Sequence, residues 1–320
     1  MEYRVIQDEA AWDEVVRAHN GHPMQSWGWG ALKEQTGPWT AHRVVCEEDG
    51  AFVCAASVLE RRLPWPFRSI CYSARGPIVE RDADLAAAAD LIAAWCRDHV
   101  HAVSYKIDPG VSGVSLNPGW REGEMILIPN TAVVDLTPDE DAIQRSFHSK
   151  KARQYIRKAE RSGVEVRPAR REDLPGILDL YHHTAEVDDF FIHTDEFYLA
   201  AFDALADVQQ LMVAEFEGRL LAFLWNITTP NAAFELWGGV TDEGKRLRAN
   251  YLLKWRAMLA AKELGAVSYD LNGLFNDGIS RFKRLFIEEE TLWIGTFDKP
   301  LSPLFDVWQG SLRLYRKFFK

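Results

Sequence analysis

The chain has 320 residues, enough for two domains, and is 47% hydrophobic and 26% charged, as in ordinary globular proteins. This balance excludes wholesale disorder, a collagen-like repeat and a small disulfide scaffold. The net charge of −10 argues against non-specific coating of nucleic acid, but it permits a local basic patch. No apolar run approaches the roughly 20 residues of a membrane span, and the first residues lack a signal-peptide layout.

The four cysteines are Cys46, Cys54, Cys71 and Cys96, and their spacing matches no metal site. Cys46 and Cys54 lie in apolar sequence that is typical of strands, so we expect them to be buried thiols. Buried free thiols are usual in a reducing compartment, and we expect the protein to be cytoplasmic.

In the first half, the patterns predict strands and helices in a mixed order. The expected elements are a strand at residues 3–6, helices at 8–19 and 25–35, a hairpin of 43–46 with 51–59, a strand at 69–72, an alanine-rich helix at 82–99 and a strand at 102–107. The hairpin turns at Asp49-Gly50, and the last strand ends at Asp108.

The second half repeats this order. The expected elements are helices at residues 172–187 and 195–205, a hairpin of 211–216 with 220–227, a strand at 233–239, a helix at 250–264 and a strand at 267–271. Its hairpin also turns at an acidic residue followed by glycine, Glu217-Gly218. We interpret the halves as two copies of one α+β unit, with a chance match of two hairpins as the alternative.

A basic segment at residues 145–161 separates the halves and carries seven Lys or Arg against one acid. On a helix, Lys150, Arg153, Arg157 and Arg161 would share one face. Such a face attracts phosphates, but a solvated helix surface explains the same composition. A smaller basic stripe near the end comprises Arg313, Arg316, Lys317 and Lys320.

Several catalytic motifs are absent from the sequence: a Walker loop, a Gly-x-Gly-x-x-Gly turn and a Gly-x-Ser-x-Gly elbow. The repeated unit resembles the GNAT acetyltransferase architecture, which binds coenzyme A pyrophosphate at a helix N-terminus. The nearest stretch to its pyrophosphate loop is 246–251, which ends in Tyr251 where a small residue is needed. An ordinary coenzyme A-dependent N-acyltransferase is therefore disfavoured, although it stays an alternative.

Five stretches, in order, resemble the Fem-type aminoacyltransferases, which use charged tRNA to build peptidoglycan cross-bridges. They are residues 25–33 (QSWGWGALK), 74–77 (ARGP), 107–109 (IDP), 149–164, and 269–273 (YDLNG) with 282–286 (FKRLF). The resemblance implies an α+β fold of two tandem GNAT-like domains, in the short form without a coiled-coil arm. We expect domains at 1–145 and 146–300, and a C-terminal helix at 301–320 that packs back on the body.

In this family, an amine on a cytoplasmic muramyl-peptide precursor attacks the ester carbonyl of aminoacyl-tRNA, without a metal or organic cofactor. The resemblance implies that Lys283 stabilises the developing negative charge and that Phe282 packs against the terminal adenosine. Asp108 could position or deprotonate the amine. A surface lysine, a core phenylalanine and a turn aspartate are the structural alternatives for these three residues.

The remaining expected site residues contact the acceptor or the tRNA. Those expected to bind substrate are Trp29, Lys33, Arg75, His193, Tyr198, Trp237 and Tyr251, with core packing favoured for Tyr251. Those expected to bind tRNA are Lys150, Lys151, Arg153, Arg157 and Lys158. We expect a monomer whose partners are aminoacyl-tRNA and a UDP-linked muramyl peptide.

One departure from the family concerns His193, which aligns with an arginine that grips the precursor's diphosphate. An imidazole is a poor substitute for a permanent cation, and the neighbouring Asp188-Asp189 would repel phosphate. An acceptor amine on a peptide or nucleoside antibiotic is therefore the alternative acceptor. A non-catalytic RNA- or peptide-binding protein that keeps only the fold is a further alternative.

Overall fold

The computed structural model describes residues 1–319, with side chains described up to Leu314. The chain forms two compact units: residues 1–129 together with 292–320, and residues 130–291. The chain passes from the first unit into the second after residue 129, before the expected boundary at 145, because residues 133–135 pair with a strand of the second unit. It returns to the first unit at residue 292, before the expected boundary at 300, because residues 297–300 pair with a strand of the first unit.

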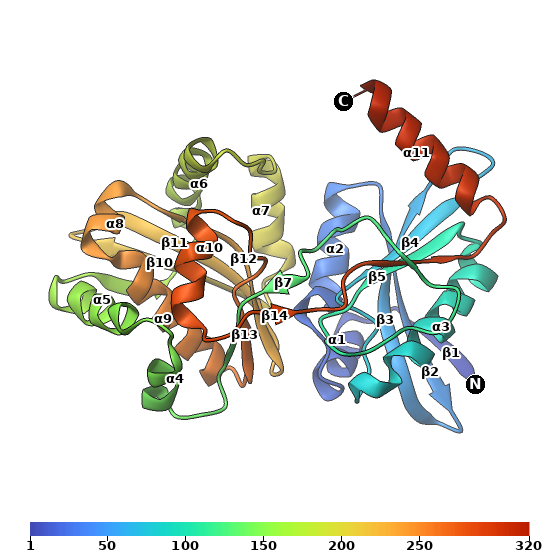
Figure 1. Ribbon diagram of the computed structural model, residues 1–320, viewed down its shortest axis with the longest axis horizontal. Coiled ribbons are helices and arrows are strands. Elements are labelled where there is room, and N and C mark those ends of the chain that lie inside the picture. The colour runs from blue at the N-terminus through green and yellow to red at the C-terminus, as the bar shows by residue number, and fades with distance from the viewer. Residues whose placement is uncertain (320) are drawn as a thin grey trace. The chain divides into compact units, whose positions relative to one another are not determined.

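The first unit contains a seven-stranded sheet in the order β1-β2-β3-β4-β5-β15-β6 (Figure 1). The strands are β1 Glu2–Ile6, β2 Thr40–Glu48, β3 Ala51–Arg62, β4 Ser69–Ala74, β5 Ser104–Asp108, β6 Arg121–Glu122 and β15 Phe297–Pro300. The helices are α1 Glu9–Ala18, η1 Pro23–Gln25, α2 Trp27–Thr36, η2 Asp82–Asp84, α3 Leu85–Trp95, η3 Cys96–Val100 and α11 Phe305–Phe319. Strands β4 and β5 are parallel, and the other pairs of this sheet are antiparallel.

The second unit contains a six-stranded sheet in the order β8-β13-β12-β11-β10-β9. The strands are β8 Val133–Asp135, β9 Glu165–Pro168, β10 Gln209–Phe216, β11 Arg219–Thr228, β12 Ala232–Val240 and β13 Ser268–Asp270. The helices are α4 Glu140–Ser146, α5 Lys150–Arg161, η4 Arg171–Asp173, α6 Leu174–Asp188, α7 Asp195–Ala204, α8 Asp242–Leu247, α9 Ala249–Glu263, α10 Gly278–Lys283 and η5 Arg284–Phe286. Two short strands, β7 Asn130–Thr131 and β14 Thr291–Leu292, lie where the chain crosses between the units.

The two units repeat one topology, as the hairpins predicted. In each unit an antiparallel hairpin is followed by a third strand, a helical crossover and a parallel strand. Both hairpins turn with positive φ at the acidic residue and the glycine, 52° and 79° at Asp49 and Gly50, and 50° and 75° at Glu217 and Gly218. Both carry a bulge four residues before that glycine, after Cys46 and after Ala214. A shared bulge and turn at the same spacing confirms the duplication.

The cores follow from the apolar faces of the crossover helices. The alanine-rich α3 buries Ala89, Ile92 and Ala93 against the first sheet, and α9 buries Leu252, Met258 and Ala261 in the second unit. All four cysteines are free and buried, as expected for Cys46 and Cys54. Among the described residues, every helix is too short or too polar to cross a lipid bilayer.

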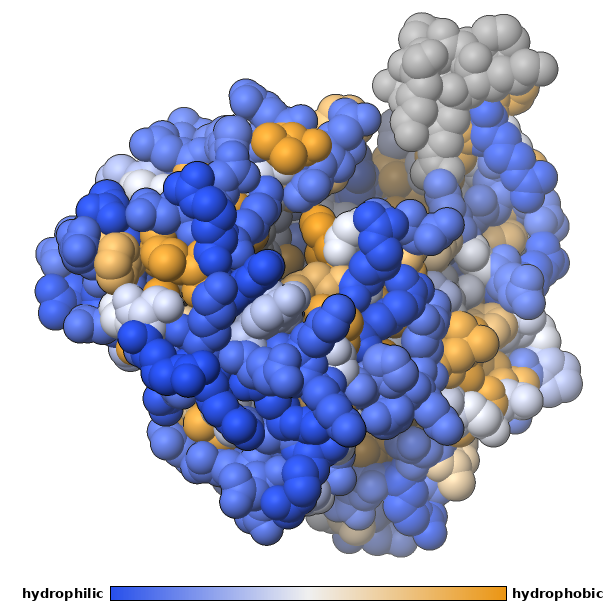
Figure 2. Space-filling view, turned by 60° about the vertical axis from the view of Figure 1, so that its left-hand side comes forward, coloured by the Kyte–Doolittle hydropathy of each residue, from blue (hydrophilic) through white to orange (hydrophobic). Residues whose placement is uncertain are grey.

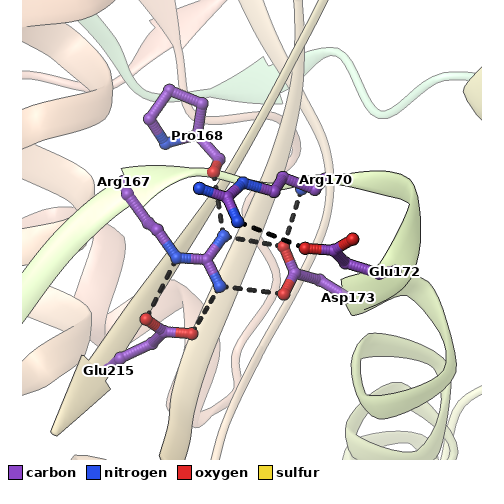
Figure 3. Close-up of polar contacts among 6 residues, drawn as sticks. All are labelled: Arg167, Pro168, Arg170, Glu172, Asp173 and Glu215. Atoms are coloured by element: carbon purple, nitrogen blue, oxygen red, sulfur yellow. Dashed lines mark hydrogen bonds and ion pairs between the residues drawn. The ribbon is translucent and has the colours of Figure 1, made fainter. Parts of the chain in front are cut away.

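The edge strand β9 is fastened by a network of charges (Figure 3). The guanidinium of Arg167 donates to Glu215 on β10 at 2.6 and 3.0 Å, and to Asp173 before α6 at 2.7 and 2.8 Å. These hydrogen bonds raise the pKa of Arg167 above its ordinary value. Planar pairing with two carboxylates fixes the start of α6 relative to the sheet edge.

The C-terminal helix α11 packs on the first unit, where the ring of Trp308 lies 5.1 Å from that of Phe67. Its first turn also carries an ion pair between Asp306 and Arg121 at 2.7 Å. Lys320, the last residue of the segment expected to pack back on the body, lies outside the described residues.

Candidate active site

In the first unit, the carboxyl end of β5 carries a buried carboxylate, Asp108, which is 1% exposed. It accepts hydrogen bonds from the Tyr72 hydroxyl at 2.7 Å and the Arg75 main-chain N–H at 3.0 Å. Burial raises the pKa of Asp108 to about 6 despite these hydrogen bonds. A carboxylate whose pKa approaches neutrality is a better proton acceptor than an ordinary aspartate, so the chemistry at this position fits a general base.

The QSWGWG segment builds the surroundings of this carboxylate. The fully buried Gln25 side chain donates to the carbonyl of Ala74 at 2.5 Å and accepts from the Ser57 N–H at 2.8 Å. Any Cβ at Gly76 would lie 2.8 Å from the Gln25 amide, so only glycine fits there. Residues 25–33 and 74–77, far apart in sequence, are therefore one structural unit beside Asp108.

Three expected substrate contacts of the first unit lie on these same segments. Lys33 is half-buried on α2, with its ammonium 4.6 Å from the ring centroid of Trp29, and burial lowers its pKa. Arg75 is 5% exposed and donates to the main-chain carbonyl of Asp108 at 3.3 Å. Arg75 and Asp108 are thus in contact. The Arg75 side chain caps the end of β5 and places a positive charge beside the carboxylate.

In the second unit, the carboxyl end of β13 is built in the same way. Asp270, the last residue of β13, accepts from the Thr131 hydroxyl and from the Asn272 N–H at 2.7 Å. Asn272 has a φ of 63° and donates from its side chain to the Glu235 carbonyl at 3.0 Å. Asp270 and Asp108 therefore occupy equivalent positions in the two repeats.

Lys283 lies at this turn. It is the last residue of α10, whose first turn is capped by Asp277 through the Ser280 N–H at 2.6 Å. Its ammonium donates to the carbonyls of Asn272 and Gly273 at 3.2 and 3.1 Å. Burial, the largest cause, lowers the pKa of Lys283 to about 8. The ammonium is thus held in place and desolvated, as stabilisation of an oxyanion requires.

A buried ion pair accompanies Lys283 and was not expected from the sequence. Glu235 on β12 pairs with Lys254 on α9, and the two residues are 6% and 5% exposed. The ammonium of Lys254 lies 5.6 Å from the ring centroid of Phe282, the neighbour of Lys283. Two signals could have revealed the pair: a glutamate inside an apolar strand and a lysine on the apolar side of a helix.

The aromatic residues expected near the tRNA end pack on one another. Tyr251, 8% exposed, meets Phe282 edge-on at 4.9 Å and Tyr155 of α5 at 5.0 Å. Phe282 also meets Phe286 at 5.3 Å. Tyr251 is therefore a packing residue, and Phe282 is partly exposed beside the lysine.

A second aromatic group contains the expected residues of α7 and β12. Trp237 meets Tyr198 edge-on at 5.0 Å and Trp225 at 5.1 Å. Tyr198 is 1% exposed, and its hydroxyl accepts from the His193 N–H at 3.0 Å. The His193 imidazole stacks on Phe197 at 3.8 Å. The structure thus brings His193, Tyr198 and Trp237 together, with Tyr198 supporting the other two from the interior.

The basic segment forms α5, which buries Ala152, Ile156 and Ala159. Four of its expected tRNA contacts are exposed: Lys150, Lys151, Arg157 and Lys158. Arg153 differs, because its guanidinium donates to the carbonyls of Gln144, Arg145 and Phe147 at the end of α4, at 2.8, 3.2 and 3.4 Å. Arg153 is therefore a structural cap.

A hollow of about 350 Å³ lies along α5, lined by Gln154, Arg157, Glu160 and Arg161. Glu160 is paired with Arg256 at 3.0 Å, so its charge is neutralised. The hollow therefore has a net positive charge from Arg157 and Arg161. The face of this unit that Figure 2 brings forward is largely hydrophilic, with isolated apolar residues. A phosphate backbone would meet little apolar surface here.

Comparison with known proteins gives matches over most of the chain. The model of the acetyltransferase (GNAT) domain family matches residues 146–284. The lipid II:glycine glycyltransferase of Staphylococcus saprophyticus is 24% identical, with 96% of this chain and 95% of the relative covered. That of Staphylococcus epidermidis is 22% identical, with 92% of each chain covered. The chain is a homologue of the Fem-type aminoacyltransferases.

Solved structures show the fold of this chain. The crystal structure of FemX superposes with a TM-score of 0.84, at 20% identity and with 100% of both chains covered. A tandem GNAT protein from the clavulanic acid pathway gives 0.50 at 12% identity, covering 94% of this chain and 99% of that one. Two tandem GNAT-like domains, expected from the sequence, are confirmed. The alignment with the S. saprophyticus relative spans 397 positions, more than this chain's 320 residues, so that relative has segments which this chain lacks.

Proposed function

We propose that this Fem-type protein transfers an amino acid from aminoacyl-tRNA to an acceptor amine of a peptidoglycan precursor in the cytoplasm. The observation that carries the proposal is the ammonium of Lys283 in the FKRLF motif, which is desolvated and donates to two carbonyls of the YDLNG stretch. Relatives named for glycyl transfer to lipid II, aligned over nearly the whole chain, support the same reaction class.

The reaction forms one bond and breaks another. The acceptor amine attacks the ester carbonyl, a C–N bond forms, and the ester C–O bond breaks. The nitrogen loses a proton and the 3′ oxygen of the tRNA gains one, so no oxidant or metal is needed. Lys283 of the second unit would stabilise the oxyanion of the tetrahedral intermediate. Asp108 of the first unit is a separate candidate for the group that positions the amine or accepts its proton.

The exposed cations of α5 would bind the phosphates of the tRNA. Lys150, Lys151, Arg157 and Lys158 are exposed on one short helix of an acidic protein. Arg153 is set apart from these four residues, because its Nη1 donates to three carbonyls at the end of α4. Local cations on an acidic body favour one docking site over non-specific coating of RNA.

The acceptor has two candidate classes, and His193 is the reason for the second. An imidazole and the exposed Asp188-Asp189 pair offer little attraction to a diphosphate. A peptide or nucleoside antibiotic with a free amine is therefore the alternative to a muramyl peptide. Coenzyme A-dependent acylation is a third, weaker candidate, since Tyr251 packs into the aromatic cluster at the start of α9.

The test is a mass measurement on the acceptor. Purified protein is mixed with a pool of charged tRNAs and UDP-linked or lipid-linked muramyl pentapeptide, with and without ribonuclease. A ribonuclease-sensitive gain of one residue mass is expected, and its size identifies the amino acid. No gain on either precursor, from protein with a cooperative thermal transition, would overturn the muramyl acceptor; antibiotic-like amines would then be assayed.

A further inference from the structure

The turn between β3 and β4 exposes a large aromatic side chain among cations. Trp65 is 93% exposed, and it lies between two exposed arginines at the end of β3, Arg61 and Arg62, and a third at Arg68. Residues 61–79 contain no acid. A single exposed tryptophan is not informative by itself, but one that adjoins further exposed apolar side chains indicates an interaction surface.

The helix α11 extends this surface. Phe67 of the turn packs against Trp308 of α11 at 5.1 Å, so the two elements are neighbours within the first unit (Figure 1). Val307 and Leu314, two helical turns apart on one face, are 57% and 59% exposed. The exposed Arg313 lies beside Leu314.

The charge of this surface opposes that of the whole protein. Among the side chains that the structure describes, the exposed cations of this surface are Arg61, Arg62, Arg68 and Arg313, in a chain of net charge −10. The one acid of α11, Asp306, is paired with Arg121. The described cations therefore lie on the β3–β4 turn, at the strand end beside it, and on the helix that packs against it.

We propose that the β3–β4 turn and α11 form a docking surface for an anionic lipid bilayer. An exposed tryptophan, aliphatic side chains on a helix, and flanking arginines and lysines are the composition of an interfacial membrane contact. The aromatic ring and aliphatic groups enter the headgroup boundary while the cations meet anionic headgroups. A nucleic acid fits less well, because Val307 and Leu314 have no planar group to stack on a base.

This inference goes beyond the proposed function and does not depend on it, because docking needs neither substrate. If both are correct, the protein works at the surface of the membrane on an acceptor presented there. Transfer to a water-soluble UDP-linked pentapeptide reports on the proposed function alone, so failure of one is distinguishable from failure of the other.

The test is sedimentation of the full-length protein with vesicles of phosphatidylcholine alone or mixed with phosphatidylglycerol. Binding is expected only to the anionic vesicles and is expected to weaken as salt is added. The Arg61→Glu/Arg62→Glu double variant should lower the partition coefficient by about tenfold or more. Trp65→Ala should lower it about fivefold, and its exposed side chain makes the loss of a fold contact negligible.

A matched pair separates docking from general surface change. Leu314→Glu is expected to abolish binding, whereas Leu264→Glu, at an equally exposed leucine (59%) of the second unit, is expected to leave it unchanged. Equal loss in both variants would overturn the proposal, as would wild-type protein that stays in the supernatant with anionic vesicles. Binding of a tRNA probe that Leu314→Glu abolishes, without vesicle binding, would assign the surface to nucleic acid instead.

Discussion

Glu235 and Lys254 pair with each other in the interior of the second unit, where 6% and 5% of their surfaces are exposed. Taking two charges out of water costs free energy that their attraction only partly returns. A hydrophobic pair of the same volume would be at least as stable, so the ion pair is poorly explained by stability. The pair instead contacts the surroundings of Lys283: Lys254 lies near the ring of Phe282, and the main-chain carbonyl of Glu235 accepts a hydrogen bond from Asn272.

Replacing one partner of this pair should lower the free energy of unfolding far more than replacing both. Lys254→Met leaves the Glu235 carboxylate buried without an ammonium partner, with only its hydrogen bond to the Tyr269 side chain to offset the charge, and should lower the free energy of unfolding by about 3–5 kcal/mol. Adding Glu235→Gln should recover a large part of that loss. Urea unfolding of the two single variants and the double variant measures the coupling. Additive effects would show that the residues do not interact.

Lys283 should govern the alkaline limb of the pH–rate profile. Its pKa is lowered to about 8, so the ammonium loses its proton as pH rises through that value. Transfer should therefore fall above about pH 8. Lys283→Met should lower kcat by about 10²–10³ below pH 8, and its difference from the wild type should shrink above that pH. Lys283→Arg, a cation throughout the range, tests the assignment in single-turnover assays. An unchanged alkaline limb in an active arginine variant would assign that limb to another group.

Asp108 is expected to reduce stability at neutral pH. Its pKa is raised from 3.8 to about 6, so the folded state binds the proton more tightly than the unfolded state does. The stabilisation is complete below the unfolded value and is lost as pH rises through about 6. Asp108→Asn should therefore raise the free energy of unfolding at pH 7, by up to about 3 kcal/mol, while lowering transfer.

The measurement for Asp108 is thermal unfolding between pH 4 and 7 alongside the rate of transfer. Asp108→Asn should flatten the pH dependence of the melting temperature across that window. Tyr72→Phe is the matched control, because it removes one hydrogen bond to the carboxylate and keeps the charge. A destabilised asparagine variant would mean that Asp108 serves the fold.

The basic residues of α5 should differ in role: Arg157 should serve tRNA binding and Arg153 should serve stability. Arg157→Ala should raise KM for aminoacyl-tRNA and reduce the salt slope of binding by about one unit, with KM for the acceptor unchanged. Arg153→Ala should instead lower stability by about 1–3 kcal/mol, because three carbonyls lose their donor. Filter binding across a salt series and urea unfolding check the two effects. An Arg153 variant that loses tRNA affinity without loss of stability would reverse the assignment.

Local patterns in the sequence were sufficient for most of the fold. The two acidic-glycine turns predicted both hairpins, and the residue patterns at 82–99 and 250–264 predicted the helices α3 and α9. The short strands β9 and β15 were not predicted, because each is four residues long and its pairing partner is remote in sequence. The domain boundaries were displaced for the same reason, since pairing across the chain sets them.

The candidate site was predictable only where a motif carried it. The resemblance pointed to Lys283 and Asp108. The structure places Asp108 at the end of β5, and Lys283 at the end of α10, where it contacts the turn after β13. It could not reveal the Glu235–Lys254 pair, because single charges in apolar elements give no partner until β12 and α9 are packed together. Nor could helix periodicity show that Arg153 turns away from its basic neighbours, since this depends on where α4 ends.

The pairing of β15 with β5 affects how the chain folds during synthesis. Residues 1–129 emerge first, yet β5 gains its antiparallel neighbour only when residues 297–300 have been made. The second unit lies wholly between these segments and can close its own sheet earlier. The nascent N-terminal unit therefore presents an open strand edge, the kind of surface that chaperones cover, and it is the last part of the protein to be completed.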